Sequence, residues 1–203
     1  MNFIPLKVSL DEACMSDFSR RYHFEEKDKN EIEKLYIKAS PRVHAQFHYC
    51  LLNNKGEALE KENTKAAKQA LVVVTLGQAF DVLQDSFLSG TEENIHKAYI
   101  LDCIGLELLA RAYGEVDKKL HELTGMYAGC YIFAGEDKLP MSEVPRLMGL
   151  LGQKLVTYNE AYVLVPKKSV LFTAPLLKEP VHKPGLCNMC GFLDCAMRQE
   201  VHK

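Results

Sequence analysis

The alternation of hydrophobic and polar residues predicts a protein that mixes helices with strands. Residues 26–39 are mostly charged, carry apolar side chains three or four positions apart and precede Pro41, which predicts an exposed helix. Strict alternation follows and is typical of a half-buried strand, whose other side, with His48 and Cys50, should face solvent or a partner. The positions that share its apolar side are Val43, Ala45, Phe47, Tyr49 and Leu51.

An uninterrupted apolar run at 70–76 predicts a central strand, because both faces of such a strand must be buried. Gly77 should end it, and a helix is expected over about 78–89. The segment 92–123 predicts a long helix with one apolar stripe. The residues of that stripe are Ile95, Tyr99, Cys103, Leu106 and Leu109.

The pattern continues with a short apolar strand at 128–134 and a helix that Ser142 can cap. Two further strands, 161–165 and 169–173, flank Pro166-Lys167-Lys168 and predict a hairpin. Helices and strands do not alternate regularly enough for a doubly wound sheet. We therefore expect an α+β fold, with a mostly antiparallel twisted sheet and flanking helices.

The character of the chain changes after Thr173, where three of its eight prolines fall within ten residues. Such a segment predicts a stiff connector with little secondary structure. We therefore expect an α+β body over residues 1–175 and a proline-rich connector with a cysteine-rich tail over 176–203. The three prolines are Pro175, Pro180 and Pro184.

The tail contains the pattern C-x-x-C-G-x-x-x-C, formed by Cys187, Cys190 and Cys195. Three thiols this close together can reach one metal ion or cluster. An iron–sulfur cluster such as [4Fe–4S], a structural zinc ion and a tail of free thiols are the three interpretations. The fourth ligand stays open, with His182, His202 and the other cysteines as candidates.

Composition narrows the classes of function. The net charge of -2 leaves no basic excess to offset phosphates, which argues against a nucleic-acid partner. No apolar run approaches the roughly 20 residues that span a bilayer, and the start of the chain does not resemble a secretory signal. We expect a cytoplasmic protein whose seven cysteines, an odd number, stay reduced. No common nucleotide-hydrolase, serine-hydrolase or zinc-protease motif occurs in the sequence.

Three segments in order resemble one family. Residues 70–122 contain Thr75-Leu76-Gly77 and a long helix, and residues 127–151 contain Leu139-Pro140-Met141-Ser142-Glu143. Residues 156–170 read Val-Thr-Tyr-Asn-Glu-Ala-Tyr-Val-Leu-Val-Pro-Lys-Lys-Ser-Val. Together they resemble the activation (reactivation) domain of cobalamin-dependent methionine synthase, in the form that some anaerobes carry as a separate chain. The resemblance covers most of residues 40–175.

The resemblance implies a ligand site as well as a fold. The family binds S-adenosylmethionine and returns oxidised cobalamin to its methylated state, and its ligand cleft corresponds here to Cys130, Tyr131 and Glu160. Met126 stands where the family has an arginine, and Thr173-Ala174 where it has an aromatic pair. Both departures remove contacts to S-adenosylmethionine, so its binding stays open. The tail is similar to the cluster motif of corrinoid iron–sulfur proteins.

These observations favour an accessory protein for reductive reactivation of a corrinoid-dependent methyltransferase. The expected partner is a corrinoid-bearing methyltransferase or a methionine synthase core, which brings the cobalamin. Whether the chain is itself an enzyme stays open. Two alternatives remain: a zinc-stabilised binding module without catalysis, and an S-adenosylmethionine-dependent methyl donor to cobalamin that needs a separate reductant.

Overall fold

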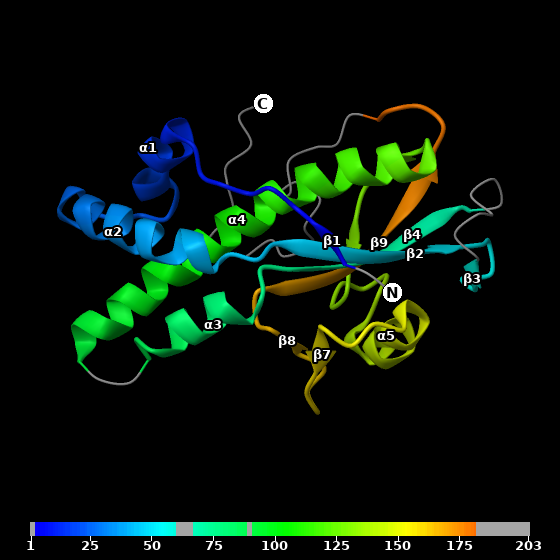
Figure 1. Ribbon diagram of the computed structural model, residues 1–203. Coiled ribbons are helices and arrows are strands. Elements are labelled where there is room, and N and C mark those ends of the chain that lie inside the picture. Colours follow the sequence, from blue (N-terminus) through cyan, green and yellow to red (C-terminus); the bar gives the residue numbers. More distant parts are fainter. Residues whose placement is uncertain (1–2, 60–66, 89–90, 182–203) are drawn as a thin grey trace.

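The computed structural model describes residues 3–59, 67–88 and 91–181, and a curled antiparallel sheet forms its centre (Figure 1). The sheet has the order β1-β2-β4-β9-β5, with β3 paired to β2 and β6 paired to β9. The strands are β1 (Ile4–Pro5), β2 (Gln46–Leu52), β3 (Ala58–Leu59), β4 (Gln69–Thr75), β5 (Tyr127–Ala128), β6 (Ile132–Phe133) and β9 (Ser169–Leu177). The expected α+β class with a mostly antiparallel sheet is confirmed.

Strand β4 lies at the centre of the sheet, between β2 and β9, as its apolar run predicts. Val72 and Val74 pack into one core, while Leu71 and Val73 pack into a second core on the opposite side. Side chains alternate across a strand, so a run of valines and leucines serves both cores at once. The two sides are called here the α4 face and the α5 face, after the helices that cover them.

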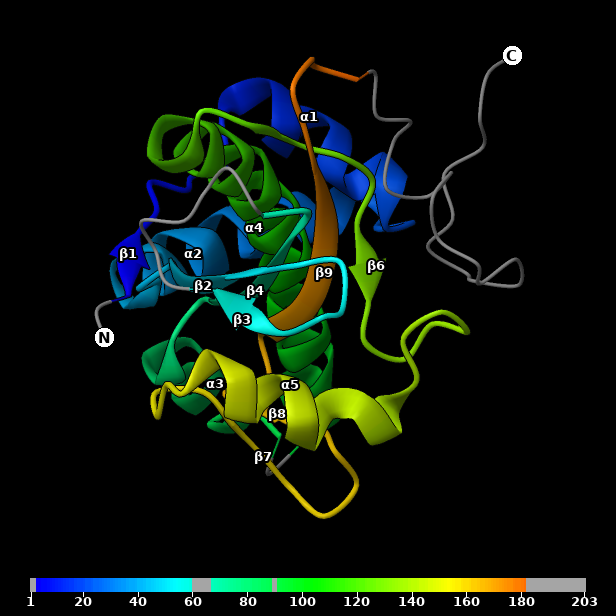
Figure 2. The same cartoon turned by 90° about the vertical axis from the view of Figure 1, so that its right-hand side faces the viewer.

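The α4 face is covered by four α-helices (Figures 1 and 2). The long helix α4 contributes more residues to this core than any other element, and the buried carboxylate of Glu107 ties α1 to it. Arg21 Nη1 lies 2.5 Å from Glu107 Oε1, and the hydroxyl of Tyr22 donates to the same oxygen at 2.9 Å. The helices are α1 (Glu12–Arg21), α2 (Lys29–Ala39), α3 (Gln78–Asp85) and α4 (Glu92–Thr124), with 3₁₀ turns η1 (Glu26–Asp28) and η2 (Ser40–Arg42) flanking α2.

The α5 face is covered by the 3₁₀ turn η4 (Met141–Glu143) and helix α5 (Val144–Leu151). This arrangement corrects the prediction that one side of β2 faces solvent or a partner. His48 is 2% exposed, its Nε2 lies 3.2 Å from the carbonyl oxygen of Leu151, and its ring lies 5.4 Å from that of Phe3. A polar residue is tolerated there because the end of α5 offers it a carbonyl partner.

The expected hairpin between 161–165 and 169–173 is not the one that forms. Strand β8 (Leu164–Val165) pairs with β7 (Thr157–Tyr158), in a separate two-stranded sheet. Strand β9 instead pairs with β4, β5 and β6, and it continues to Leu177 through Pro175. The body therefore keeps regular structure past the point where the prolines predict a connector.

Three smaller differences concern strand and helix boundaries. The expected strand 128–134 is divided into β5 and β6 by three residues, and helix α1 has no counterpart in the expectations from sequence. Helix α4 has the expected length, but its exposed side includes Ile95, Tyr99 and Leu106, which the predicted apolar stripe assigns to the core.

Within the described residues, no helix combines the length and apolar character that crossing a membrane requires.

Candidate functional site

Tyr131, expected at a ligand site, lies in the core between α4 and the sheet. Its ring centroid is 4.3 Å from that of Phe172, and its hydroxyl donates to the carboxylate of Asp117 on α4, with the carbonyl oxygen of Tyr113 3.2 Å away. Burial raises the pKa of Tyr131, and the neighbouring charge of Asp117 raises it further. The phenol is therefore a neutral hydrogen-bond donor that joins α4 to the short segment between β5 and β6.

Cys130 precedes Tyr131 and is exposed. The backbone at this point lies against β9: the Gly129 amide donates to the Pro175 carbonyl at 2.8 Å, and a Cβ on Gly129 would lie 2.7 Å from Pro175 Cγ. Glycine fits there because the ring of Pro175 fills the space that a larger residue's Cβ would need. The two consecutive side chains that follow lie on opposite sides, with Tyr131 buried and Cys130 exposed.

Glu160 lies in the turn between β7 and β8 and is exposed. The turn is organised by Asn159, whose Oδ1 accepts the amides of Ala161 and Val163, both at 3.0 Å. Tyr162 adopts a left-handed backbone with φ of 61°, a conformation that is uncommon for a large side chain. Glu160 and Tyr131 thus belong to different parts of the fold, one on an exposed turn and the other in the core.

A hollow of about 200 Å³ lies on the α5 face, beside the β7–β8 sheet. Its walls are mostly apolar, and none of the three residues expected at the ligand site lines it. The lining residues come from β6 and the residue after it, from η4 and α5, from the β7–β8 turn, and from the start of β9 with the residues just before it. The lining residues are Phe133, Ala134, Met141, Val144, Tyr162, Val163, Leu164, Lys167, Ser169, Val170 and Leu171.

The hollow lies between two segments that follow each other closely along the chain. All of its lining residues except Leu171 fall within 127–151 and 156–170, the second and third segments on which the family resemblance rests. The sequence analysis identified these segments but did not predict that Tyr162, Lys167 and Ser169 line a hollow, as its polar residues. The signal that could have found them is their place in the sharpest segment of the resemblance.

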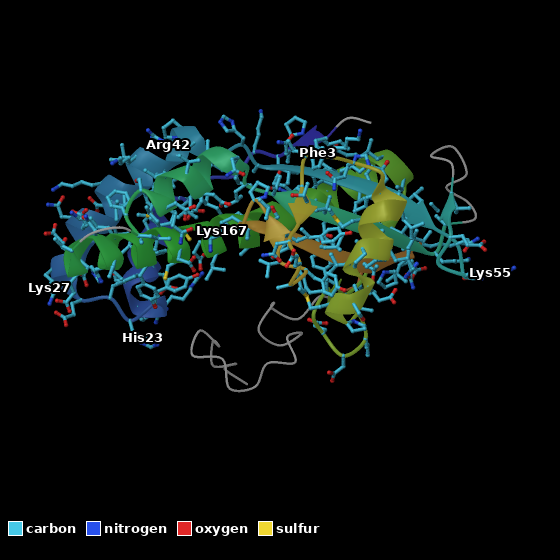
Figure 3. The ribbon with its side chains drawn as sticks, turned by 90° about the horizontal axis from the view of Figure 1, so that it is seen from below. Phe3, His23, Lys27, Arg42, Lys55 and Lys167 are labelled. Atoms are coloured by element: carbon cyan, nitrogen blue, oxygen red, sulfur yellow. The ribbon has the colours of Figure 1, made fainter. Side chains whose placement is uncertain are left out.

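The polar side of the hollow is held in place by an acidic residue of α3. The buried carboxylate of Asp81 accepts the amide of Lys167 at 2.5 Å and that of Lys168 at 3.4 Å. The Lys167 side chain, labelled in Figure 3, extends to Asp85, with Nζ 2.5 Å from Oδ1. Because two carboxylates anchor this lysine pair from one helix, the start of β9 has a fixed position beside the hollow.

The side chain of Lys168 lies against α4 and passes the helix at Gly105, where no side chain projects. Its Nζ lies 2.7 Å from Asp102 Oδ1, and a Cβ on Gly105 would lie 2.8 Å from Lys168 Cε and 3.0 Å from Phe80 Cε1. Gly105 therefore makes room for a nearly buried lysine. This contact links the central helix of the α4 face to the residues beside the hollow.

The predicted metal ligands Cys187, Cys190 and Cys195 lie outside the described residues. Within residues 3–59, 67–88 and 91–181, no group of three or more histidine, cysteine or acidic side chains is arranged to hold a metal ion. Burial raises the pKa of Cys50 and of Cys103 to about 11, so both stay protonated near neutral pH. Cys130 is the exposed member of the four described cysteines.

Comparison with known proteins supports the fold. Neither a family model nor a curated protein matches the sequence. Among solved structures, the fold is similar to one described as the crystal structure of the MetH reactivation domain bound to AdoHcy, with a TM-score of 0.52 and 12% sequence identity. The match covers 90% of this chain and 81% of the other. The chain has the fold of a MetH reactivation domain.

Proposed function

We propose that the chain is an accessory protein in the reductive reactivation of a corrinoid-dependent methyltransferase such as methionine synthase. The observation that carries this proposal is the fold, which is similar to the MetH reactivation domain over nine-tenths of the chain. The hollow adds support, because its walls come from two of the segments in which the sequence resembles that family. The corrinoid would be brought by the partner protein.

The proposed ligand is an S-adenosyl compound, since the similar structure is described as bound to AdoHcy. The hollow measures about 200 Å³. This volume is below the roughly 300–1,000 Å³ of sites that enclose a whole small-molecule ligand. It would therefore take one apolar or ring-shaped end of the ligand. The exposed side chains of Cys130 and Glu160 are then the proposed contacts for the rest of the ligand. Tyr131 would hold the segment that carries Cys130 against α4.

The proposed role of the tail is to hold a metal group through Cys187, Cys190 and Cys195. Returning cob(II)alamin to its methylated state needs one electron and one methyl group. A reduced iron–sulfur cluster on these cysteines would pass the electron to cobalt and be re-reduced by a separate electron donor, while S-adenosylmethionine would give the methyl group and leave as AdoHcy. The buried cysteines of the body are poor candidates for a fourth ligand, because burial favours their protonated form.

Metal content tests the tail directly. The protein is purified without oxygen, and iron, sulfide and zinc are measured in the wild type, in Cys190→Ala and in Cys130→Ala as the matched control. About four irons per chain that are lost only in Cys190→Ala would support the cluster. About one zinc per chain would favour the metal-stabilised binding module instead. Neither metal in the wild type would contradict a metal-holding tail.

Ligand binding tests the hollow separately. S-adenosylmethionine and AdoHcy are titrated into the protein by calorimetry, and Val163→Trp is compared with Val165→Trp. Both valines are partly exposed near β8, but only Val163 lines the hollow. We expect Val163→Trp to weaken binding by about tenfold or more, because the indole occupies the space of the ligand. Equal affinities in the two variants would remove the hollow from the proposal.

A further inference from the structure

A hollow of about 660 Å³, called here the aromatic hollow, lies between the turn that follows α1 and the start of α4. This volume falls within the roughly 300–1,000 Å³ of sites that hold a whole small molecule. His23 and Lys27, both labelled in Figure 3, mark its place at one end of the molecule. It shares no lining residue with the hollow on the α5 face. The lining side chains are those of Tyr22, His23, Phe24, Glu25, Lys27, Asp28, Glu92, Glu93, His96 and Tyr99.

Part of the lining is a group of rings that pack on Phe24. The ring centroid of Phe24 lies 5.6 Å from that of Tyr99 and 5.9 Å from that of His96, both on α4. On α1, the ring of Phe18 stacks on Phe24 at 5.7 Å, with the two planes 8° apart. The Phe24 ring is therefore held from two helices, while Tyr99 remains 46% exposed. Such ring faces attract both flat apolar groups and cations.

Asp28, in the 3₁₀ turn η1, joins the acidic part of the lining to the rings. Its Oδ2 accepts the amide of Glu25 at 3.0 Å, and its Oδ1 lies 3.2 Å from His96 Nε2. The Asp28 side chain is 13% exposed. One carboxylate thus closes η1 and contacts α4, so the packing of the protein fixes the position of η1 beside the rings.

Negative charge exceeds positive charge in this lining, which contains four carboxylates and one lysine. That lysine, Lys27, is paired with Glu25 at 2.8 Å. Glu93 is paired at 2.6 Å with Lys97, which lies outside the lining. Glu92 is exposed in the first turn of α4 and makes no ion pair with any other residue that the structure describes. The hollow therefore offers unmatched negative charge beside its aromatic rings.

This combination of rings and charge narrows the class of ligand. In the described part of the chain, no three histidine, cysteine or acidic side chains are arranged to hold a metal ion, so these carboxylates do not indicate a metal site. A neutral ligand would leave the negative charge unmatched, and an anion would be repelled. The space is also far larger than one lysine or arginine side chain of a partner protein would fill.

We propose that the aromatic hollow binds a small organic cation, in which a substituted ammonium group is joined to an apolar or ring-shaped part. The rings of Phe24 and Tyr99 would contact the apolar part and attract the charge through their faces. Glu92 would contribute a carboxylate that faces the positive group without losing an existing ion pair. This ligand is distinct from the S-adenosyl compound proposed for the α5 face.

Fluorescence titration tests the requirement for charge. The sequence contains no tryptophan, so Tyr99→Trp places a single fluorophore in the hollow, and Tyr158→Trp places one on the exposed β7–β8 sheet as the control. The probes are benzyltrimethylammonium, choline and 3,3-dimethylbutanol, a neutral compound with the shape of choline. We expect choline to bind about fivefold more tightly than the alcohol, and benzyltrimethylammonium more tightly than choline.

Three results of this titration would overturn the proposal. The first is equal affinity for choline and the neutral alcohol, which would remove the role of charge. The second is a fluorescence change of the same size in Tyr158→Trp. The third is the absence of saturable binding of benzyltrimethylammonium below about 10 mM.

A pair of charge variants locates the site independently of the fluorophore. Calorimetry with benzyltrimethylammonium compares the wild type with Glu92→Gln and with Glu122→Gln, an exposed control near the other end of α4. We expect binding about threefold weaker in Glu92→Gln, a difference that shrinks at high salt concentration, and no change in Glu122→Gln. Circular dichroism confirms that the variants are folded.

Equal affinities in Glu92→Gln and the wild type would contradict the proposed contact, and equal losses in both variants would show attraction by overall charge alone. Neither measurement involves S-adenosylmethionine, a metal or a corrinoid partner. The proposed function and this inference can therefore fail separately.

Discussion

The two faces of the sheet differ in how completely they are covered. On the α4 face, the long helix and three shorter ones seal the sheet, and buried groups such as Glu107 connect helices to one another. On the α5 face, one short helix and a two-stranded sheet leave a hollow of about 200 Å³. The sheet thus divides into a closely packed face and a face that keeps the hollow proposed to take a ligand.

The largest expected effect tests this division with one substitution on each face. Leu108 belongs to the core of the α4 face and Leu147 to that of the α5 face, and both are 1% exposed. We expect Leu108→Ala to lower the free energy of unfolding by about 4–5 kcal/mol and Leu147→Ala by about 2–3 kcal/mol. The difference arises because the thinner face can collapse into the space. Urea unfolding measures both, and the reverse order would contradict the comparison.

The next effect concerns the buried carboxylate of the α4 face. Replacing Arg21 by Met leaves Glu107 without its charged partner in a nearly dry place. We expect the free energy of unfolding to fall by about 2–3 kcal/mol, less than for a fully enclosed pair because Arg21 is partly exposed. Arg20→Met is the control, since Arg20 is 86% exposed and should give no measurable loss. A loss of similar size in both variants would mean that Glu107 does not hold α1.

The contact between the two faces can be tested at Gly105. A methyl group there would overlap Lys168 Cε, so Gly105→Ala should cost about 1–3 kcal/mol of unfolding free energy. Lys168→Ala removes the obstacle, and the double variant should lose less than the sum of the two single variants. Thermal unfolding of all four proteins completes this cycle. Strict additivity would show that the helix tolerates the methyl group without moving the lysine.

An alkaline titration should expose the buried thiol of α4. Burial raises the pKa of Cys103 to about 11 in the folded protein, from about 9.0 for an exposed thiol. The unfolded chain therefore loses this proton first, so the stabilising contribution is complete below pH 9 and is lost as the pH rises towards 11. Relative to Cys103→Ala, wild-type stability should fall by about 1–2 kcal/mol over this interval. Parallel pH profiles would contradict the expectation.

The smallest effect compares cysteine labelling on the two faces. Iodoacetamide modification is followed by peptide mass spectrometry, residue by residue. The exposed Cys130 should react first, the half-buried Cys50 of the α5 face more slowly, and the enclosed Cys103 of the α4 face last. If Cys103 reacts before Cys50, the α4 face opens more readily than its packing indicates.

Sequence patterns predicted an element correctly where its neighbours only need to be apolar. The apolar run at 70–76 required two covered faces, and the sheet provides them around β4. The side of β2 that carries His48 was predicted wrongly, because alternation cannot reveal that α5 brings a carbonyl partner to a histidine. The hairpin around Pro166 failed for a related reason. By local sequence alone, β8 and β9 could pair with each other. In the structure β8 pairs with β7, and β9 pairs with the distant strand β4.

The candidate site could be predicted only in part. The segments that form the hollow were recognised by resemblance, but its geometry depends on where η4 and the β7–β8 sheet meet. Tyr131 shows why a residue type is not enough. An aromatic residue with a polar end suits a ligand cleft or a core equally well, and the carboxylate of Asp117 placed it in the core. The cysteine motif remains a prediction from sequence.

The position of β9 has a consequence for how the protein is made. The strand that completes the centre of the sheet, β9, is the last of the described strands to be synthesised, while its neighbour β4 emerges about a hundred residues earlier. Until Leu177 has left the ribosome, one edge of β4 stays unpaired and rich in valine. Such an edge readily pairs with other chains. Association with other chains during synthesis is therefore the misfolding route that the late arrival of β9 leaves open.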